Sequence, residues 1–378
     1  MESLSSPSEK KDSDLARGKA SYDYIPALDG FRGVAILTLM LSHGGLGNIV
    51  PGILALLTFF VISSFLITRQ MIVEIEKTGT MNLKKFYLRR IFRLIPALVL
   101  FIIFFAPIMY YLGIPPTQMQ VASVLFYFAN YYQIFVGYPV GNPFPIVWSL
   151  SVEEHYYILL PCCMMLFSRN LRQILPWLCA VLLGILLWRI VLYHSCLADP
   201  AWWVCGPAGS PRWKGTDVML DCVLYGAVAA LLLHYHNGAV WRWCINRPAF
   251  FLSVAGIFIS LATRSPAFRE TFRFTVQTLC VSVMVLNILF GKWSTPRDIL
   301  SSKFLIFIGQ ISYSLYLFHF GVMVTLTAFK HEDAMHGVDF LLYGLGAPVL
   351  ATVSYYLIER PMIAIRKKVG SHRKEMVG

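Results

Sequence analysis

The stretch that decides the fold is residues 28–47, LDGFRGVAILTLMLSHGGLG, an apolar block long enough to cross a bilayer. Arg32 and His43 lie inside it, although ionisable side chains are costly within a membrane. Eleven residues return a helix to nearly the same face, so the two side chains are predicted to share a polar stripe, roughly 16 Å apart along the axis. The stretch therefore predicts a site with an anion-binding guanidinium near one surface and a titratable imidazole deeper in the membrane.

The composition of the whole chain places it among membrane proteins. It has 378 residues, of which 57% are hydrophobic, and a mean hydropathy of +0.62. Its apolar residues fall in blocks of about 17 to 25, the length that spans a bilayer. The net charge of +12 could suggest nucleic acid in a soluble protein. Here Lys and Arg cluster between the apolar blocks, which is the ordinary topological signal, so no nucleic-acid partner is expected.

The apolar blocks predict an all-α bundle with about ten transmembrane helices and both termini in the cytoplasm. About eleven blocks are candidates, but two basic termini require an even number of crossings. The weakest block is 119–136, which is short and contains Asn130 and Gln133, so we expect it not to cross. The predicted organisation is a disordered cytoplasmic tail over 1–24, a transmembrane domain over 25–361 and a basic cytoplasmic tail over 362–378.

The eight cysteines do not show the spacing of a metal site, so no metal is expected. Most lie inside apolar blocks, where cysteine behaves as a small hydrophobe. Cys196 and Cys205 differ because they share a loop that the predicted topology places outside the cell. They could pair if that loop faces an oxidising compartment.

A basic run over residues 84–96 opens the third apolar block and contains Arg89, Arg90 and Arg93. Arg90 and Arg93 are three residues apart and therefore share a helical face. Any cytoplasmic loop collects positive charge, so the run could be a topological signal alone. Alternatively, neighbouring arginines at the start of a helix could bind the phosphates of a nucleotide-bearing cofactor through bidentate contacts.

Two further motifs place polar groups inside predicted spans. The first, residues 148–157, brings Glu153 and Glu154 into the membrane, which indicates either a functional site or a buried ion pair with an arginine such as Arg32. The second, residues 309–319, carries hydroxyls that could join helices, while its histidine could line a cavity. The residues predicted to line a substrate site are Trp148, Ser149, Tyr313 and His319.

Six motifs in order resemble the acyltransferase-3 family of integral-membrane O-acyltransferases. The resemblance runs from about residue 24 to 361, and the chain departs from the usual family pattern at Ser64, His155 and Tyr156. The motifs are Ala27 to Gly33 followed by His43, Phe59 to Ile67, Phe86 to Pro96, Trp148 to Tyr157, Ile308 to His319, and Tyr356 to Pro361.

The resemblance implies transfer of an acyl group, commonly acetyl, from cytoplasmic acyl-CoA to a hydroxyl of a glycan, glycolipid or other acceptor. The family's Arg-x10-His pair falls on Arg32 and His43, and its Arg-x-x-Arg element on Arg90 and Arg93. We expect His43 to act as a base or as an acylated nucleophile, with Glu153 or Glu154 orienting it and Arg32 assisting. Acyl-CoA phosphates are expected at Arg89, Arg90 and Arg93.

A bacterial cytoplasmic membrane is the expected location, and the lipid bilayer an expected partner. Many family members carry a hydrolase-like domain after the last span, which this sequence does not include, so the chain is expected to act alone or with a separate protein. The alternative function is a proton-coupled transporter or flippase of an anionic lipid or sugar. The absence of paired repeats disfavours that alternative.

Overall fold

The computed structural model describes residues 24–207, 211–291, 294–330, 335 and 337–370. The predicted N-terminal tail, apart from its last residue, and the end of the predicted C-terminal tail lie outside these ranges. Within them the chain forms helices and connecting turns and no strand, as the apolar blocks predicted. The α-helices are α2 (Pro26–Leu41), α3 (Gly52–Thr78), α4 (Leu83–Tyr111), α5 (Gln118–Leu125), α6 (Ala129–Phe135), α7 (Trp148–Leu166), α8 (Ile174–Ala198), α9 (Thr216–Tyr235), α10 (Asn237–Trp243), α11 (Arg247–Ala262), α12 (Pro266–Glu270), α13 (Arg273–Phe290), α14 (Ser294–Leu300), α15 (Lys303–Gln310), α16 (Ser312–Lys330), α17 (Val338–Ser354) and α18 (Arg360–Gly370).

Seven helical segments in the described part of the chain are long and apolar enough to cross a membrane. The segment 119–136, which was expected not to cross, forms α5 and α6, of 8 and 7 residues. At about 1.5 Å per residue, neither could span the hydrocarbon core. The seven segments are Gly52–Thr78, Leu83–Tyr111, Leu171–Ala198, Thr216–Tyr235, Arg273–Phe290, Ser312–Lys330 and Val338–Ile365.

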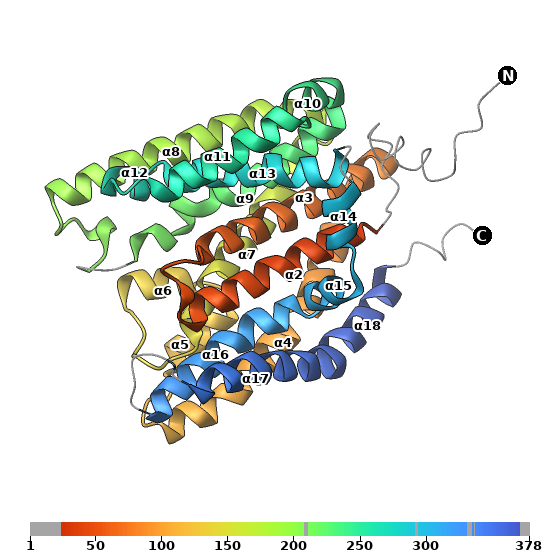
Figure 1. Ribbon diagram of the computed structural model, residues 1–378. Helices are drawn as coiled ribbons and strands as arrows, with labels where there is room; N and C mark the ends of the chain where they lie inside the picture. The colour runs from red at the N-terminus through yellow and green to blue at the C-terminus, as the bar shows by residue number, and fades with distance from the viewer. Residues whose placement is uncertain (1–23, 208–210, 292–293, 331–334, 336, 371–378) are drawn as a thin grey trace.

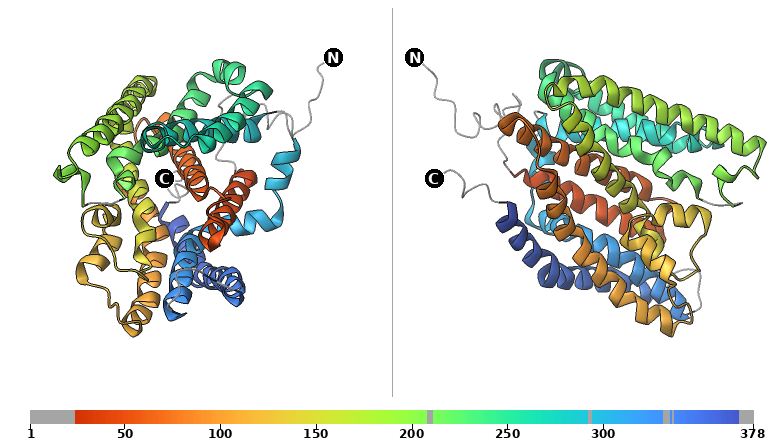
Figure 2. Two further views of the ribbon diagram at one scale, coloured as in Figure 1. Left: turned by 60° about the vertical axis from the view of Figure 1, so that its left-hand side comes forward. Right: turned by 180° about the vertical axis from the view of Figure 1, so that it is seen from behind.

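The long helices lie side by side in one bundle (Figure 1). Helices α8, α11 and α13 form one side, α4, α16 and α17 form the other, and α2 and α3 lie between them (Figures 1 and 2). Helix α2 begins and α18 ends at one end of the bundle, whereas α8 ends at the opposite end (Figure 2). The bundle therefore has two ends that can be told apart, and α2 and α3 run through its centre.

Glycines let α2 pack unusually close to α14 and α15. A Cβ on Gly30 would lie 1.7 Å from the carbonyl oxygen of Leu300, and one on Gly309 would lie 1.8 Å from that of Asp29. Small residues allow this backbone-to-backbone approach in membrane helices. The contact fixes the first turns of α2, which carry Arg32.

Gly309→Ala is expected to lower the thermal unfolding midpoint in detergent, because the new methyl group meets backbone that cannot move aside. Overpacking of this kind costs about 1–3 kcal/mol or more. Gly184→Ala in α8 is the matched control, since a Cβ there meets nothing within 4 Å. It should leave stability unchanged or raise it slightly, because alanine favours a helix over glycine. Equal midpoints for the two variants would contradict the close contact.

The sequence predicted one straight helix through Arg32 and His43, but the first helix does not continue straight through His43. Helix α2 ends at Leu41, and Ser42–Leu46 form a π-helical turn in which Gly45 has φ of 103°. Such a backbone angle is strained for most residues and open to glycine. The regular α-helix that the prediction of one polar stripe assumed therefore ends before His43. Turns of this type are frequent at functional sites.

Candidate active site

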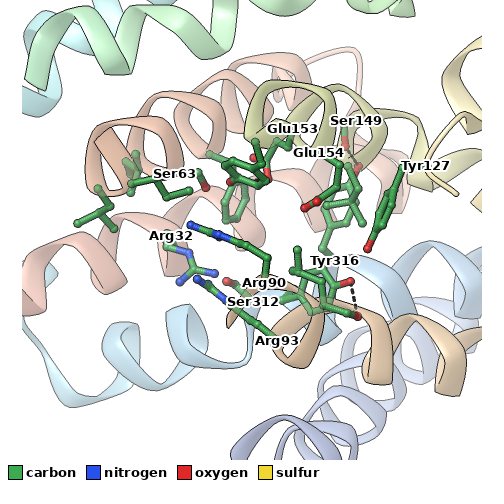
Figure 3. Close-up of a pocket in the computed structure, with 18 of the residues that line it drawn as sticks. Arg32, Ser63, Arg90, Arg93, Tyr127, Ser149, Glu153, Glu154, Ser312 and Tyr316 are labelled. Atoms are coloured by element: carbon green, nitrogen blue, oxygen red, sulfur yellow. Dashed lines mark hydrogen bonds between the residues drawn. The ribbon is translucent and has the colours of Figure 1, made fainter. Parts of the chain in front are cut away.

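A cavity of about 230 Å³ lies between α2, α3, α4, α7 and α16. It brings together residues from five of the six motifs: Arg32, Ser63, the arginines of α4, the carboxylates of α7, and the hydroxyl side chains of α16 (Figure 3). These segments are far apart in the sequence, so only the folded bundle joins them. The cavity therefore collects most of the charged groups that the sequence placed inside predicted spans.

Three guanidinium groups face this cavity. Those of Arg32, Arg90 and Arg93 gather on one side of it (Figure 3). Arg93 lies near enough to repel both of the others, and Arg90 lies 4.4 Å from the centre of the Tyr157 ring. Among the described residues, the Nε atom of Arg32 is buried without a hydrogen-bond partner, and Asp29 lies 3.6 Å from the same guanidinium. Glu153, Glu154 and Glu359 interact with these arginines at longer range, so among the described residues Asp29 is the one carboxylate within 4.0 Å of the cluster.

Arg89 has a different environment from Arg90 and Arg93. Its guanidinium lies 3.5 Å from Glu74 of α3, and its side chain is 30% exposed. At the start of the same helix, the amide oxygen of Asn82 accepts a hydrogen bond from the Lys85 N–H and so caps α4. The basic run thus divides into an ion-paired arginine at the cavity edge and two that face its interior.

Glu153 and Glu154 enter the cavity from α7 (Figure 3). In the part of the chain that the structure describes, neither carboxylate lies within 4.0 Å of a cationic nitrogen, so the expected alternative of a direct ion pair with Arg32 is not formed. Glu153 accepts a hydrogen bond of 3.3 Å from the Tyr157 hydroxyl. Both carboxylates interact with Arg90 at longer range, which leaves their oxygens available to the cavity.

Hydroxyl groups close the inner end of the cavity. The Tyr316 hydroxyl donates to the carbonyl oxygen of Ile146 at 2.9 Å, so the Ser149 hydroxyl, 2.5 Å away, donates to the Tyr316 oxygen. Tyr313 donates to the carbonyl oxygen of Leu94 at 2.9 Å. Ser149 and Tyr313, both expected near substrate, therefore line this cavity, whereas Trp148, expected with them, does not.

His43 and His319 form a stacked pair. His43 Nδ1 lies 3.0 Å from His319 Nε2, and the two rings are nearly parallel with centroids 5.2 Å apart. His319 is fully buried, and its Nδ1 lies 2.9 Å from the carbonyl oxygen of Leu315, an atom that can only accept. In a neutral pair His319 Nδ1 therefore carries the proton, His319 Nε2 accepts, and His43 Nδ1 donates. This assignment leaves His43 Nε2 with a free lone pair.

The histidine pair lies behind the end wall of the cavity. Tyr316 lines the cavity, and its ring centroid is 5.8 Å from that of His319, but neither histidine is a lining residue. The expected open passage from the arginines to His43 is therefore interrupted at Tyr316. The hydrogen bonds of Tyr316 to Ile146 and Ser149 hold the phenol in this position. Similarly, no carboxylate among the described residues forms a hydrogen bond with His43, whose Nδ1 pairs with His319 instead.

Tyr127 belongs to the cavity although the sequence did not point to it. It lies between α5 and α6, and its φ of 55° is unusual for a residue other than glycine. Its hydroxyl is buried in the cavity wall without a hydrogen-bond partner among the described residues (Figure 3). Strained backbone of this kind clusters at functional sites. No sequence signal marks it, because its role depends on a turn within a segment recognised only as non-spanning.

Comparison with known proteins identifies the family. A model described as an acyltransferase domain matches residues 25–359. The O-acetyltransferase OatA of Staphylococcus aureus strain NCTC 8325 is 27% identical over 91% of this chain, and a putative O-acetyltransferase of Staphylococcus aureus strain COL is 26% identical over 89%. The chain spans 58% and 57% of the lengths of these two relatives. No solved structure matches. With its apolar spans, the chain is an integral membrane protein that belongs to the acyltransferase-3 family.

Proposed function

We propose that the chain transfers an acyl group, acetyl in the first instance, from cytoplasmic acyl-CoA to a hydroxyl of a glycan or glycolipid. The observation that carries this proposal is the gathering of Arg32, Arg90 and Arg93 around one cavity, where among the described residues only Asp29 lies within 4.0 Å of any of their nitrogens. Buried like charges repel one another, and phosphates would offset that repulsion through bidentate contacts. Family membership and relatives described as O-acetyltransferases support the reaction class.

The proposed topology has ten crossings with both termini in the cytoplasm. Helices α2, α7 and α11 would add to the seven segments above. The Cys196–Cys205 disulfide lies at the end of α8, opposite the end where α2 begins. Disulfides persist in oxidising compartments, which favours an extracytoplasmic position for that end. The arginine cavity then belongs to the cytoplasmic half, and the membrane we propose is a bacterial cytoplasmic membrane.

In the proposed reaction, His43 Nε2 removes the proton from the acceptor hydroxyl as its oxygen attacks the thioester carbonyl. The carbon–sulfur bond breaks, and CoA leaves as a thiolate that takes up a proton. Arg32 is the group placed to stabilise charge on the donor, while the arginines of α4 hold its phosphates. His319 holds the His43 proton on Nδ1. The Tyr316 side chain would have to move for the thioester to reach His43.

The test of this function is direct acyl transfer by the purified protein in liposomes. Labelled acetyl-CoA is supplied with extracted membrane glycans, and label is measured in the glycan fraction and in free acetate. Transfer to glycan is the expected result. Movement of an anionic lipid or sugar across the liposome membrane with no transfer of label would instead favour the transporter alternative.

His319 provides a separate prediction, because it acts on substrate only through His43. His319→Phe removes the acceptor for the His43 Nδ1 proton and is expected to lower kcat by at least about 10-fold, the scale of losing an orienting partner of a functional histidine. His319→Gln, whose amide oxygen can accept, should retain more activity. The acyl-CoA KM should stay the same in both variants. Equal kcat for the folded Phe and Gln variants would contradict the orienting role.

A further inference from the structure

A second cavity, of about 310 Å³, lies at the end of the bundle that carries the disulfide. Trp213 and Phe274 line it with nearly parallel rings whose centroids are 5.9 Å apart. Arg189 also lines it, but its guanidinium is tied to Asp221 in a buried ion pair of 2.6 Å. Two aromatic side chains and an ion-paired arginine therefore line this cavity. It lies at the end of the bundle opposite the one where α2 begins.

The loop that carries Trp213 is held by a network of hydrogen bonds. The Asn130 amide donates to the Thr216 hydroxyl at 2.9 Å, and His155, one of the departures from the family pattern, lies 2.6 Å from that hydroxyl. The next residue, Asp217, accepts hydrogen bonds from the Trp188 indole at 2.8 Å and from the Tyr131 hydroxyl at 3.1 Å. The segment over residues 212–217, which leads into the first turn of α9, is therefore held in place by hydrogen bonds to other helices.

Lys214 in this segment is a half-buried cation next to Trp213, although it is not itself a lining residue of the second cavity. Its Nζ lies 5.3 Å from the Trp213 ring and 5.4 Å from the Trp148 ring, and it is near enough to His43 to interact electrostatically. Burial lowers the pKa of Lys214 to about 8. No carboxylate lies within 4.0 Å of its Nζ among the described residues. An anion bound here would offset the cost of burying this ammonium.

Further positive charge lies on the same end of the bundle. Arg264 lies just before α12, Arg269 lies within it and Arg273 begins α13, close in sequence to Glu270 and Phe274 of the cavity lining. Arg264 and Arg269 are exposed, and the buried Nε of Arg273 has no hydrogen-bond partner among the described residues. The positive-inside rule disfavours arginines at an outer surface, so the topological signal does not explain them.

Resting on the proposed function, we propose that the second cavity binds the acceptor and that the acceptor is a sugar carrying a negative charge. The Trp213 ring packs against the apolar face of the sugar, and the Lys214 ammonium binds its anionic group. A hydroxyl of the same sugar then lies toward His43 Nε2. On this proposal the donor reaches the histidine pair past Tyr316, and the acceptor reaches it past Lys214.

The experiment compares a glucuronic-acid oligosaccharide with its carboxyl-reduced, neutral counterpart as acceptors, using labelled acetyl-CoA. The unaltered protein should acetylate the acidic sugar with a kcat/KM at least about 10-fold higher, the scale of one hydrogen bond to a charged group. Lys214→Met should abolish this preference, whereas Lys214→Arg should keep most of it. Trp213→Ala should raise the acceptor KM for both sugars. The acyl-CoA KM should not change in any of these variants.

Lys303→Met is the matched control, because Lys303 is an exposed lysine at the start of α15. Equal use of both sugars, or an acidic preference that survives Lys214→Met, would overturn the acceptor assignment. Cleavage of acetyl-CoA to free acetate with transfer to neither sugar would also overturn it, while leaving the donor site intact. Failure to bind or cleave acetyl-CoA at all would instead overturn the proposed function.

Discussion

Replacing His43 by alanine is expected to lower acyl transfer by about 10²- to 10⁴-fold, the usual contribution of a general base. The reason is geometric, because the hydrogen bond from His43 Nδ1 to His319 fixes the proton on one nitrogen and leaves the other as a base. The acyl-CoA KM should change little, since the arginine cavity does not include His43. The measurement is steady-state transfer of labelled acetyl to acceptor by purified protein.

The control for this variant is His194→Ala, which removes an exposed histidine near the end of α8. Both variants should elute as single species from a sizing column and unfold at similar temperatures. Full transfer activity in a folded His43→Ala protein would remove this residue from the reaction. Acetylated His43 trapped in the absence of acceptor would show that it acts as a nucleophile instead of a base.

Replacing Arg90 and Arg93 together by alanine is expected to raise the acyl-CoA KM by more than about 100-fold. Each hydrogen bond to a charged group contributes about 1.5–3 kcal/mol, and two guanidinium groups that line the cavity would be lost. The rate at saturating donor should fall much less, because the histidine pair is untouched. Donor binding by the unaltered protein should also weaken as salt rises, since phosphates and cations attract one another electrostatically.

Lys84→Ala combined with Lys85→Ala removes the same formal charge from the first turn of α4, but neither lysine lines the cavity. A similar rise in KM in this control would indicate that general positive charge attracts the donor. An unchanged KM in the arginine variant would show that the donor does not bind in this cavity. The two outcomes separate a specific phosphate site from the topological charge of a cytoplasmic loop.

Much of the architecture could be predicted because membrane burial leaves a strong signal in the sequence. The apolar blocks predicted helices, and the polar residues in 119–136 correctly indicated a segment that forms no long helix. Charged residues inside apolar blocks pointed to the groups around the first cavity, since such residues are costly unless they serve a function. Arg32, Glu153 and Glu154 were found in this way, whereas Arg90 and Arg93 were indicated by the basic run that opens the third apolar block.

The rest depends on three-dimensional contacts that periodicity does not encode. The His43–His319 pair joins residues 276 apart in the sequence, and the π-helical turn that contains His43 depends on the positive φ of Gly45. Tyr127 was missed because its backbone strain is set by the turn between α5 and α6. Lys214 was missed because a lysine in a loop ordinarily faces solvent, whereas the hydrogen bonds of neighbouring residues hold this one among aromatic rings.

The most direct test of the account is a cryo-electron-microscopy structure of the protein in lipid nanodiscs with a non-hydrolysable acetyl-CoA analogue. The account predicts phosphate density within hydrogen-bond distance of Arg90 and Arg93, with the acetyl group directed past Tyr316 toward His43. Binding of the analogue at the disulfide end, or in the arginine cavity with its acetyl group directed away from Tyr316, would contradict it.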